Sequence, residues 1–391
     1  LGRQDRAAAG LGNNLSIRPA EVDRDLCHSV AFAVGGPPDR AVVREILEGS
    51  EPVKGGDVVQ RTQDLVGVLH EDVVRVQAFR PAVIAAGVCA LGGLLAGATR
   101  AVLEGYAARD ARLRVLARDR GGIVAALNAG IAAARGRYIA RMDADDVCRP
   151  ERLARQAASL DAHPEIGLVS CLAAFGGDPG KARGYCAHLD WANGLRDPEA
   201  IRFGIFRESP LPHPSVMFRA ELPGRHGGYR QGPFPEDYEL WLRWLDAGVA
   251  MAKVPEPLLV WNDPPGRLSR TDARYDTEAF FRVKAGYLAR LLERINPHHP
   301  NVLVAGAGRI TRRRAEHLLD HGVAITAWLD IDPRKVHCVV GGRPVLPLTD
   351  TPPPSDCFVL PYVSSRGAVE SLSAFLERRG FRLGRSYLSA A

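Results

Sequence analysis

The sequence lacks the cysteine spacings that mark metal and redox sites. Its seven cysteines stand at positions 27, 89, 148, 171, 186, 338 and 357, with no CxxC pair and no Cys/His ligand spacing. We therefore expect reduced and mostly buried thiols, as in a cytoplasmic protein. The first thirty residues carry charges throughout and contain no apolar core, so no signal peptide is predicted.

A strong excess of one charge is also missing. The 51 Lys and Arg residues face 45 Asp and Glu residues, the net charge is +6, and the arginines are scattered along the chain. This balance argues against a dedicated nucleic-acid surface, so no nucleic-acid partner is expected. An anionic substrate, or peripheral association with the inner face of a membrane, stays compatible with it. The length of 391 residues predicts two or three domains.

One long charge-free run, "PAVIAAGVCALGGLLAGA" at 81–98, could in principle span a bilayer. Alanine and glycine dominate it and supply little hydrophobic drive. The alternatives are a membrane span and a buried or disordered segment, and the composition favours the second.

From residue 98 onward, apolar periodicity predicts alternating strands and helices. Helices are expected at 99–110, 121–136 and 150–164, and strands at 113–119, 137–142 and 166–175. Such alternation favours an α/β sheet whose ligands bind beyond the carboxyl ends of its strands.

Three carboxylates, Asp143, Asp145 and Asp146, gather at one such strand end in "RYIARMDADDVCRP". A D-x-D pair on a tight turn can share a divalent cation, and hard oxygen ligands suit Mg²⁺ or Mn²⁺. The alternative is an Asp-rich turn that caps the helix beginning at Pro150.

The stretch "GGIVAALNAGIAAARGRYIARMDADDVCRPERLARQ" resembles family 2 of the nucleotide-sugar glycosyltransferases. The resemblance continues through "HPEIGLVS", "HPSVMFRAEL" and "GPFPEDYELWLRWLDAG" and covers about residues 99–290. It implies the GT-A fold, a mostly parallel sheet with helices on both faces. It also implies a metal-assisted, inverting transfer of sugar from a nucleotide diphosphate to a hydroxyl of a glycan, lipid-linked or small-molecule acceptor.

The resemblance assigns residues to the donor side of the site. Asp143 would approach the ribose, Asp145 would hold the metal with help from Asp143, and Asn128 would line the donor pocket. Asp146 would cap the next helix or orient its neighbour. Arg267 and Arg270, in "WNDPPGRLSR", could contact the diphosphate, although a solvated loop is an equal alternative.

"PEDYELWLRWL" carries the second part of the predicted site. Glu236 and Asp237 fall in the first turn of a helix, where acidic residues commonly serve only as caps. The resemblance instead makes Asp237 the catalytic base and Glu236 its support. It places His213 and Trp241 on the acceptor side, although a histidine before a proline is more often structural.

Residues 1–98 depart from the family pattern. The opening strand and the Asp-Asp-Gly-Ser type motif that holds base and ribose are absent, and "ALGGLLAGA" stands where they should precede residue 99. Either half of the nucleotide pocket is missing, or this part comes from a shifted reading frame of a GC-rich coding sequence. We therefore expect 1–98 to supply neither the usual first strands nor a complete pocket, so a non-catalytic, degenerate protein is the alternative function.

A new unit is predicted to follow the glycosyltransferase domain (99–295) at 296–391. "NVLVAGAGRITRRRAEHLLDHGVAITAWLDIDP" indicates strand, glycine turn, helix and strand, with Gly306 and Gly308 in the turn and Asp330 at the second strand's end. This pattern predicts a small Rossmann-like domain that could bind a nucleotide, although a third glycine is missing. A regulatory or scaffolding role is the favoured interpretation, and an oxidoreductase is a distant alternative.

Overall fold

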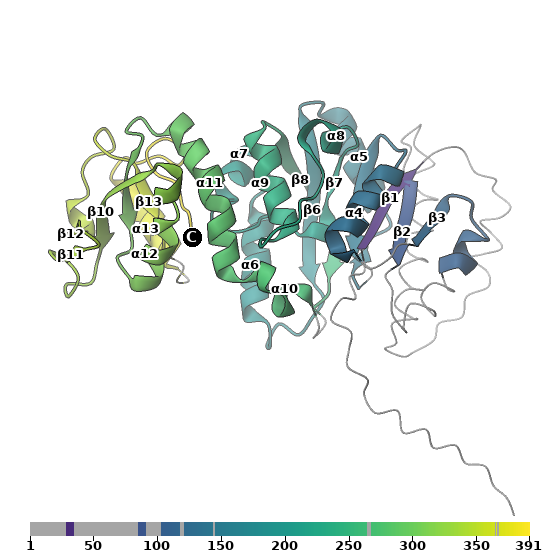
Figure 1. Cartoon of the computed structure of the whole chain (residues 1–391), viewed down its shortest axis with the longest axis horizontal. Coiled ribbons are helices and arrows are strands. Elements are labelled where there is room, and N and C mark those ends of the chain that lie inside the picture. Colours follow the sequence, from purple (N-terminus) through teal and green to yellow (C-terminus); the bar gives the residue numbers. More distant parts are fainter. Residues whose placement is uncertain are drawn as a thin grey trace, which may run out of the picture.

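The computed structural model describes residues 29–34, 85–90, 103–117, 121–143, 145–263, 267–363, 365 and 367–391. Two β-sheets lie on either side of the long helix α11 (Thr277–Ile295) (Figure 1). The larger sheet has the strand order β3-β2-β1-β4-β7-β6-β8-β5, and the smaller one β11-β12-β10-β9-β13.

The strands of the larger sheet are β1 (Ser29–Val34), β2 (Ala85–Ala90), β3 (Leu113–Ala117), β4 (Tyr138–Asp143), β5 (Val147–Cys148), β6 (Ile166–Phe175), β7 (Met217–Arg219) and β8 (Ala250–Trp261). The helices of this part are α4 (Gly122–Ala133), α5 (Arg152–Ala162), α6 (Arg183–Gly194), α7 (Pro198–Gly204), α8 (Leu222–His226), α9 (Glu236–Asp246) and α10 (Leu268–Thr271), with 3₁₀ turns η1 (His213–Ser215) and η2 (Ala273–Tyr275).

The larger sheet buries both of its faces. Along β4, Ile139 enters one apolar cluster while its neighbours Tyr138 and Ala140 enter another, as the two-residue period of a strand requires. Helices α4 and α9 contribute to the first cluster, and α5 and α6 to the second. The predicted α/β class, with helices on both faces, is confirmed.

The expected predominance of parallel pairing is wrong for this sheet. Only β2 with β3 and β6 with β8 pair in parallel, whereas β4 with β7, β6 with β7, β5 with β8, and β1 with both β2 and β4 are antiparallel. A parallel pair needs a crossover that returns the chain to the same edge of the sheet. Strand direction thus depends on connections, which apolar periodicity does not reveal.

The expectation that residues 1–98 supply none of the usual first strands is also wrong. Strand β1 lies beside β4, with Ser29 opposite Asp143 and Phe32 opposite Ala140, and β2 pairs with β1. Both segments are charge-free six-residue runs, which suit a strand between two neighbours. The expectation that residues 1–98 lack a complete nucleotide pocket concerns residues that lie largely outside those the structure describes.

Strand β2 occupies 85–90, inside the charge-free run at 81–98. Among the residues that the structure describes, no helix has the length and apolar character needed to cross a membrane.

The smaller sheet is built from β9 (Asn301–Ala305), β10 (Ala324–Asp330), β11 (Val339–Val340), β12 (Arg343–Pro347) and β13 (Val359–Pro361). Strand β9 pairs in parallel with β10 and β13, and β10 with β12. Helix α12 (Arg309–Glu316) packs on one face and α13 (Ala368–Arg378) on the other. The order β12-β10-β9-β13, with all three pairings parallel, fits the small Rossmann-like unit expected at 296–391, whose nucleotide binding stays a prediction.

Candidate functional site

The three predicted aspartates form one cluster at the end of β4. One carboxylate oxygen from each of Asp143, Asp145 and Asp146 lies within 4.8 Å of the other two. Asn262, just beyond β8, fixes this turn, since its backbone N–H donates to Asp146 Oδ1 at 2.8 Å and its side chain to the Asp145 carbonyl at 2.5 Å. The long strand β8 therefore positions the acidic turn.

Because the three carboxylates are crowded and shielded from water, their ionised forms are unfavourable unless a positive charge lies beside them. Burial, together with the charges of Asp143 and Asp145, holds the pKa of Asp146 well above its usual range. Burial and Asp143 also raise the pKa of Asp145. Asp146 Oδ2 is buried and has no hydrogen-bond partner in the described part of the chain. An oxygen-only site with an orphaned buried oxygen fits a divalent cation such as Mg²⁺ or Mn²⁺.

Asp146 does not cap the following helix, which corrects the sequence expectation. The N-cap of α5 is Glu151, and no side chain makes a capping hydrogen bond there. The buried carboxylate of Asp146 instead joins the acidic cluster and accepts from Asn262.

Arg141 lies between the acidic cluster and the start of α9. It stands two residues before Asp143 on β4, so both side chains point to the same face, and the two form an ion pair. Its side chain is buried, and its Nε finds no acceptor among the described residues. Burial raises the pKa of carboxyls in both groups, and the guanidinium charge offsets part of this rise in Asp145 on one side and in Glu236 and Asp237 on the other.

The first turn of α9 presents a pair of unlike carboxylates. Glu236 is buried, and the hydroxyl of Tyr275 donates to its two oxygens at 2.8 and 2.7 Å. Asp237 is half-buried and accepts from the backbone N–H of Tyr238 at 2.7 Å. Burial and the neighbouring Glu236 charge raise the pKa of Asp237 to about 7. A carboxylate with that pKa can accept a proton near neutral pH.

His213 and Trp241 occupy a buried aromatic group beside this pair. His213 Nε2 lies 2.7 Å from the Tyr229 hydroxyl, and its ring centroid is 5.9 Å from that of Trp241. Burial lowers the pKa of His213, which keeps the ring neutral. Trp241 is 0% exposed. The predicted acceptor contact of Trp241 is therefore wrong in this conformation, because the indole has no accessible surface.

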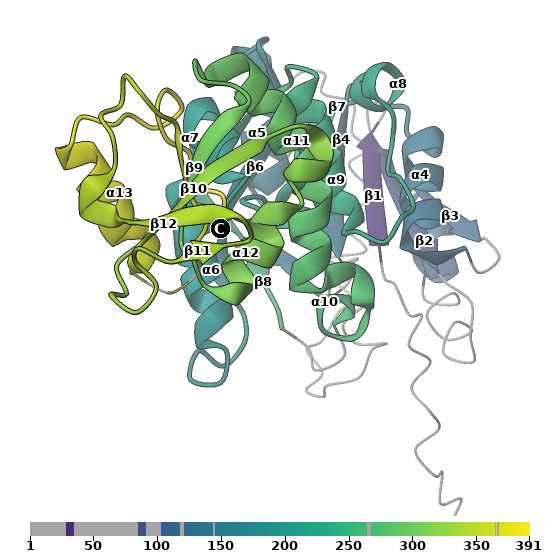
Figure 2. The same cartoon turned by 60° about the vertical axis from the view of Figure 1, so that its left-hand side comes forward.

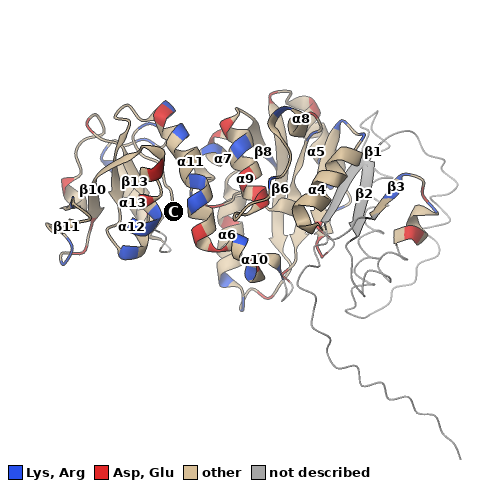
Figure 3. Ribbon diagram, viewed as in Figure 1, with Lys and Arg blue, Asp and Glu red and all other residues tan. Residues whose placement is uncertain are grey.

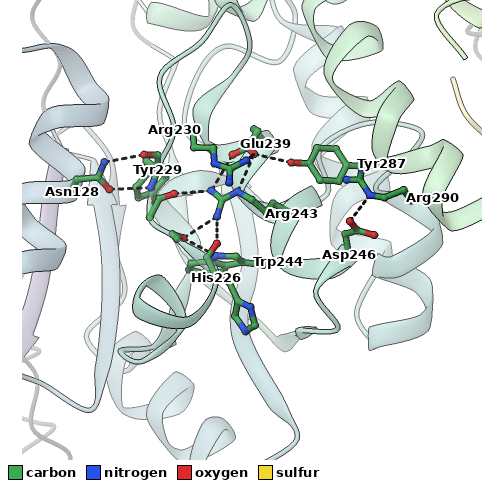
Figure 4. A network of polar contacts seen from close by, with 12 residues as sticks. Asn128, His226, Tyr229, Arg230, Glu239, Arg243, Trp244, Asp246, Tyr287 and Arg290 are labelled. Atoms are coloured by element: carbon green, nitrogen blue, oxygen red, sulfur yellow. Dashed lines mark hydrogen bonds and ion pairs between the residues drawn. The ribbon is translucent and has the colours of Figure 1, made fainter. Parts of the chain in front are cut away.

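Asn128 holds the segment that precedes α9. Its side-chain amide donates to the Tyr229 carbonyl at 2.9 Å and accepts from the Tyr229 N–H at 2.9 Å (Figure 4). Both polar ends thus bind one backbone residue more than 100 positions away. The predicted donor contact of Asn128 stays a prediction, and its observed role is to position Tyr229.

Arg270 lies on α10 and Arg267 just before it, and both side chains lie close to the carboxylate of Asp263. Arg270 pairs with Asp263 at 2.5 Å, and Arg267 lies 3.8 Å from the same carboxylate. The Arg267 guanidinium stacks over the Trp261 ring, 4.3 Å from its centroid. Its charge offsets part of the rise that burial and the neighbouring aspartates cause in the pKa of Asp145 and Asp146, so Arg267 lies near the acidic cluster. The solvated-loop alternative does not describe Arg267, whose side chain is 14% exposed.

In the C-terminal part, Gly306 and Gly308 form the predicted turn between β9 and α12. Gly306 has φ +115°, and a Cβ there would lie 2.9 Å from Thr311, so a side chain is excluded. Asp330 binds this turn directly, accepting from the Ala307 N–H at 2.8 Å.

The predicted ribose contact of Asp330 is not supported by this geometry. Its Oδ1 accepts from the N–H groups of Ile331 and Asp332, and its Oδ2 from Ala307 and from Lys335 Nζ. A carboxylate has about four acceptor positions, and all four are used within the chain. Asp330 therefore stabilises the glycine turn.

Sequence reasoning missed Arg141 and Tyr275. A signal existed for Arg141, since it is the only charge inside the run Tyr138–Met142 and is in phase with Asp143. No local signal marks Tyr275, which reaches Glu236 from 39 positions away because α11 packs against both α9 and η2.

The comparisons with known proteins agree with this site. Residues 97–220 match the family described as glycosyl transferase family 2. The chain is similar to the amylovoran biosynthesis glycosyltransferase AmsE of Erwinia amylovora, with 33% identity over 138 residues, 35% of this chain and 49% of that protein. It is also similar to an uncharacterized glycosyltransferase of Haemophilus influenzae, with 29% identity, covering 41% of this chain and 58% of that one.

Among solved structures, the chain is similar to the mannosyltransferase PcManGT from Pyrobaculum calidifontis, solved with GDP-Man and Mn²⁺. The identity is 16% and the TM-score 0.39, over 64% of this chain and 69% of that one, which is too distant to bear on the substrate. The chain spans about half the length of the curated relatives named above. The match to the glycosyl transferase family 2 model covers residues 97–220 and so includes the strand that ends in the acidic cluster.

Proposed function

We propose that the chain is an inverting glycosyltransferase that moves a sugar from a nucleotide diphosphate to an acceptor hydroxyl. The observation that carries the proposal is the position of Arg141, which is ion-paired with Asp143 and whose charge also offsets part of the rise that burial and Glu236 cause in the pKa of Asp237. Its charge acts on the carboxylate cluster suited to a metal ion and on the carboxylate suited to act as a base. A transferase needs a metal site and a base around one reacting centre.

Asp143, Asp145 and Asp146 would hold a Mg²⁺ or Mn²⁺ ion through their clustered oxygens. When bound, the ion would offset charge on the donor diphosphate and on the departing nucleotide. Arg267, which lies near the same cluster, would bind the diphosphate from the other side, with Arg270 beside it.

Asp237 would accept the proton of the acceptor hydroxyl as that oxygen attacks the anomeric carbon. Its half-buried position leaves it open to a substrate, whereas Glu236 is closed off by Tyr275. One base and one displacement on the face opposite the leaving nucleotide invert the anomeric carbon. His213 would lie near the acceptor.

The acceptor class is a glycan, a lipid-linked sugar or a small molecule, with peripheral membrane contact if it is lipid-linked. The competing hypothesis is a protein that binds a nucleotide sugar without turnover, since the Asp-Asp-Gly-Ser type motif is absent upstream of residue 99.

One experiment separates the two hypotheses. Purified chain would be incubated with Mn²⁺ and a panel of nucleotide sugars, and both donor binding by calorimetry and released nucleoside diphosphate would be measured. Release that depends on Mn²⁺ and is lost in Asp237→Asn supports the transferase. Binding without release, in the presence of varied acceptor sugars, supports the non-catalytic alternative.

A further inference from the structure

We infer that Tyr275 is a positioning residue that keeps Glu236 ionised, so that the exchangeable proton of the Glu236–Asp237 pair resides on Asp237. The inference rests on the proposed role of Asp237 as the base and assigns how that base is prepared. It starts from the two hydrogen bonds that the Tyr275 hydroxyl directs at the Glu236 carboxylate, at 2.8 and 2.7 Å.

The geometry makes the two carboxyl groups unequal. A hydroxyl placed between both oxygens of Glu236 stabilises the carboxylate and not the acid, because a protonated carboxyl offers one fewer acceptor oxygen. Asp237 accepts only from the backbone in the described structure. As the pH falls, the pair should therefore take up its first proton at Asp237.

The other groups facing the pair act on both members or hold Tyr275 in place. Burial raises the pKa of both carboxyls, and Arg141 from β4 offsets part of this rise in both, while Arg274 from η2 offsets part of it in Glu236. Tyr229, from the segment before α9, has its own pKa raised by burial and by both carboxylates. Arg274 is itself fixed by Asp272, which also accepts from the Arg274 N–H at the start of η2. Tyr275 is thus the residue that distinguishes Glu236 from Asp237 by direct hydrogen bonding.

The chain contains a matched control for this contact. Tyr287, on α11, donates through its hydroxyl to Oε1 of Glu239 at 2.8 Å. Both tyrosines are half-buried, and both bind a buried glutamate of α9 from the segment that follows α10. Glu239 differs because it pairs with Arg243 and is not adjacent to Asp237. Tyr287→Phe therefore removes an equivalent bond without touching the carboxyl pair.

The test is a ¹³C NMR titration of the side-chain carboxyls in the full chain, labelled at Asp and Glu, with resonances assigned from Asp237→Asn and Glu236→Gln. In the wild type, Asp237 should titrate near pH 7. In Tyr275→Phe, its midpoint should fall by about one pH unit while that of Glu236 rises by a similar amount, the scale expected when one carboxylate loses a hydrogen bond. Tyr287→Phe should leave both midpoints unchanged.

An unchanged Asp237 midpoint in Tyr275→Phe, or an equal shift in Tyr287→Phe, would overturn the inference. If Tyr275→Phe does not fold, the wild-type titration still tests the inference, because a first proton taken up at Glu236 and not at Asp237 as the pH falls would overturn it. The titration is independent of turnover. A wild type that transfers no sugar would defeat the proposed function, while the titration would still decide the role of Tyr275.

Discussion

At the scale of single residues, the site depends on charges that would be unfavourable alone. Among the residues that the structure describes, buried Asp146 has no hydrogen-bond partner for Oδ2, and buried Arg141 has none for Nε. Burying an unpaired polar group costs about 1–3 kcal/mol. Such groups are expected where a ligand completes the hydrogen bonding, which is why we assign them to the site and not to the core.

The first prediction concerns the base. Asp237→Asn should lower transfer by about 10²–10⁴-fold, because the amide keeps the carboxylate's size but cannot accept a proton. Donor affinity should change little. In the wild type, kcat/KM should fall as the pH drops through about 7, where the active carboxylate of Asp237 becomes protonated. Steady-state rates from pH 5 to 9 would check this. Near wild-type turnover in Asp237→Asn would mean that Asp237 serves only in the first turn of α9 and is not the base.

The second prediction separates the metal ligands from the base. Asp145→Asn should weaken Mn²⁺-dependent donor binding, because it removes a charged oxygen from the cluster. Asp178→Asn, at an exposed turn outside the cluster, is the control. Calorimetric titration of the donor with and without Mn²⁺ measures the effect. Equal donor affinity in Asp145→Asn and wild type, at every Mn²⁺ concentration, would exclude this residue as a ligand.

At the scale of secondary-structure elements, helix α9 connects the candidate base to the rest of the fold. Its Glu239–Arg243 pair is buried, and Arg243 donates to the backbone carbonyls of His226, Gly227 and Gly228 (Figure 4). Tyr287 binds the same glutamate from α11, which packs beside α9 (Figure 2). These contacts fix the segment that carries Tyr229 and the start of α9.

The third prediction tests this network. Arg243→Met should lower the free energy of unfolding by about 3–5 kcal/mol, since it removes the buried salt-bridge partner of Glu239 and the donor to three backbone carbonyls. Arg290→Met removes an ion pair with Asp246 from the exposed side of α11 and should cost less than about 1 kcal/mol. Urea denaturation of the two variants would measure the difference. Similar costs would show that the buried pair contributes no more than the exposed one.

At the scale of the whole molecule, the predicted boundary near residue 296 does not divide the core. One apolar cluster contains Phe281 and Leu288 of α11 together with Val304 of β9 and Leu388 near the C-terminus. The C-terminal residues lie beside α11 (Figure 1). Charged residues of both signs line the same junction, where Glu278 pairs with Arg313 and Arg314 (Figure 3). We therefore propose that the C-terminal part serves as a scaffold for α11 and, through it, for α9.

The fourth prediction tests this junction with two glycines of one loop. Gly384 and Gly380 both have positive φ, so alanine is strained at either position. A Cβ at Gly384 would lie 2.2 Å from the buried ring of Phe203 on α7, whereas at Gly380 its nearest neighbour is Pro354 at 3.9 Å. Gly384→Ala should therefore destabilise the chain by about 1–3 kcal/mol more than Gly380→Ala.

Differential scanning calorimetry of both glycine variants would check this fourth prediction. A single transition that moves to lower temperature in Gly384→Ala would show that the two sheets unfold together. Two transitions, with only the C-terminal one affected, would contradict the scaffold proposal.

The sequence alone determined the elements whose signals are local. The apolar run Ile166–Phe175, the D-x-D turn and the acidic first turn of α9 could be located from periodicity and composition, because each depends on neighbours within a few residues. The glycine turn at Gly306 was predictable for the same reason.

Only the tertiary structure decided which of these local signals act together. Strand direction, the pairing of β1 with β4, the burial of Trp241 and the reach of Tyr275 to Glu236 all join positions far apart in the chain. The same holds for Asp330, whose spacing suggested a ribose contact until its oxygens were found bound to the turn. Contacts of this kind depend on how elements pack, and packing is a property of the folded chain that no short window of sequence contains.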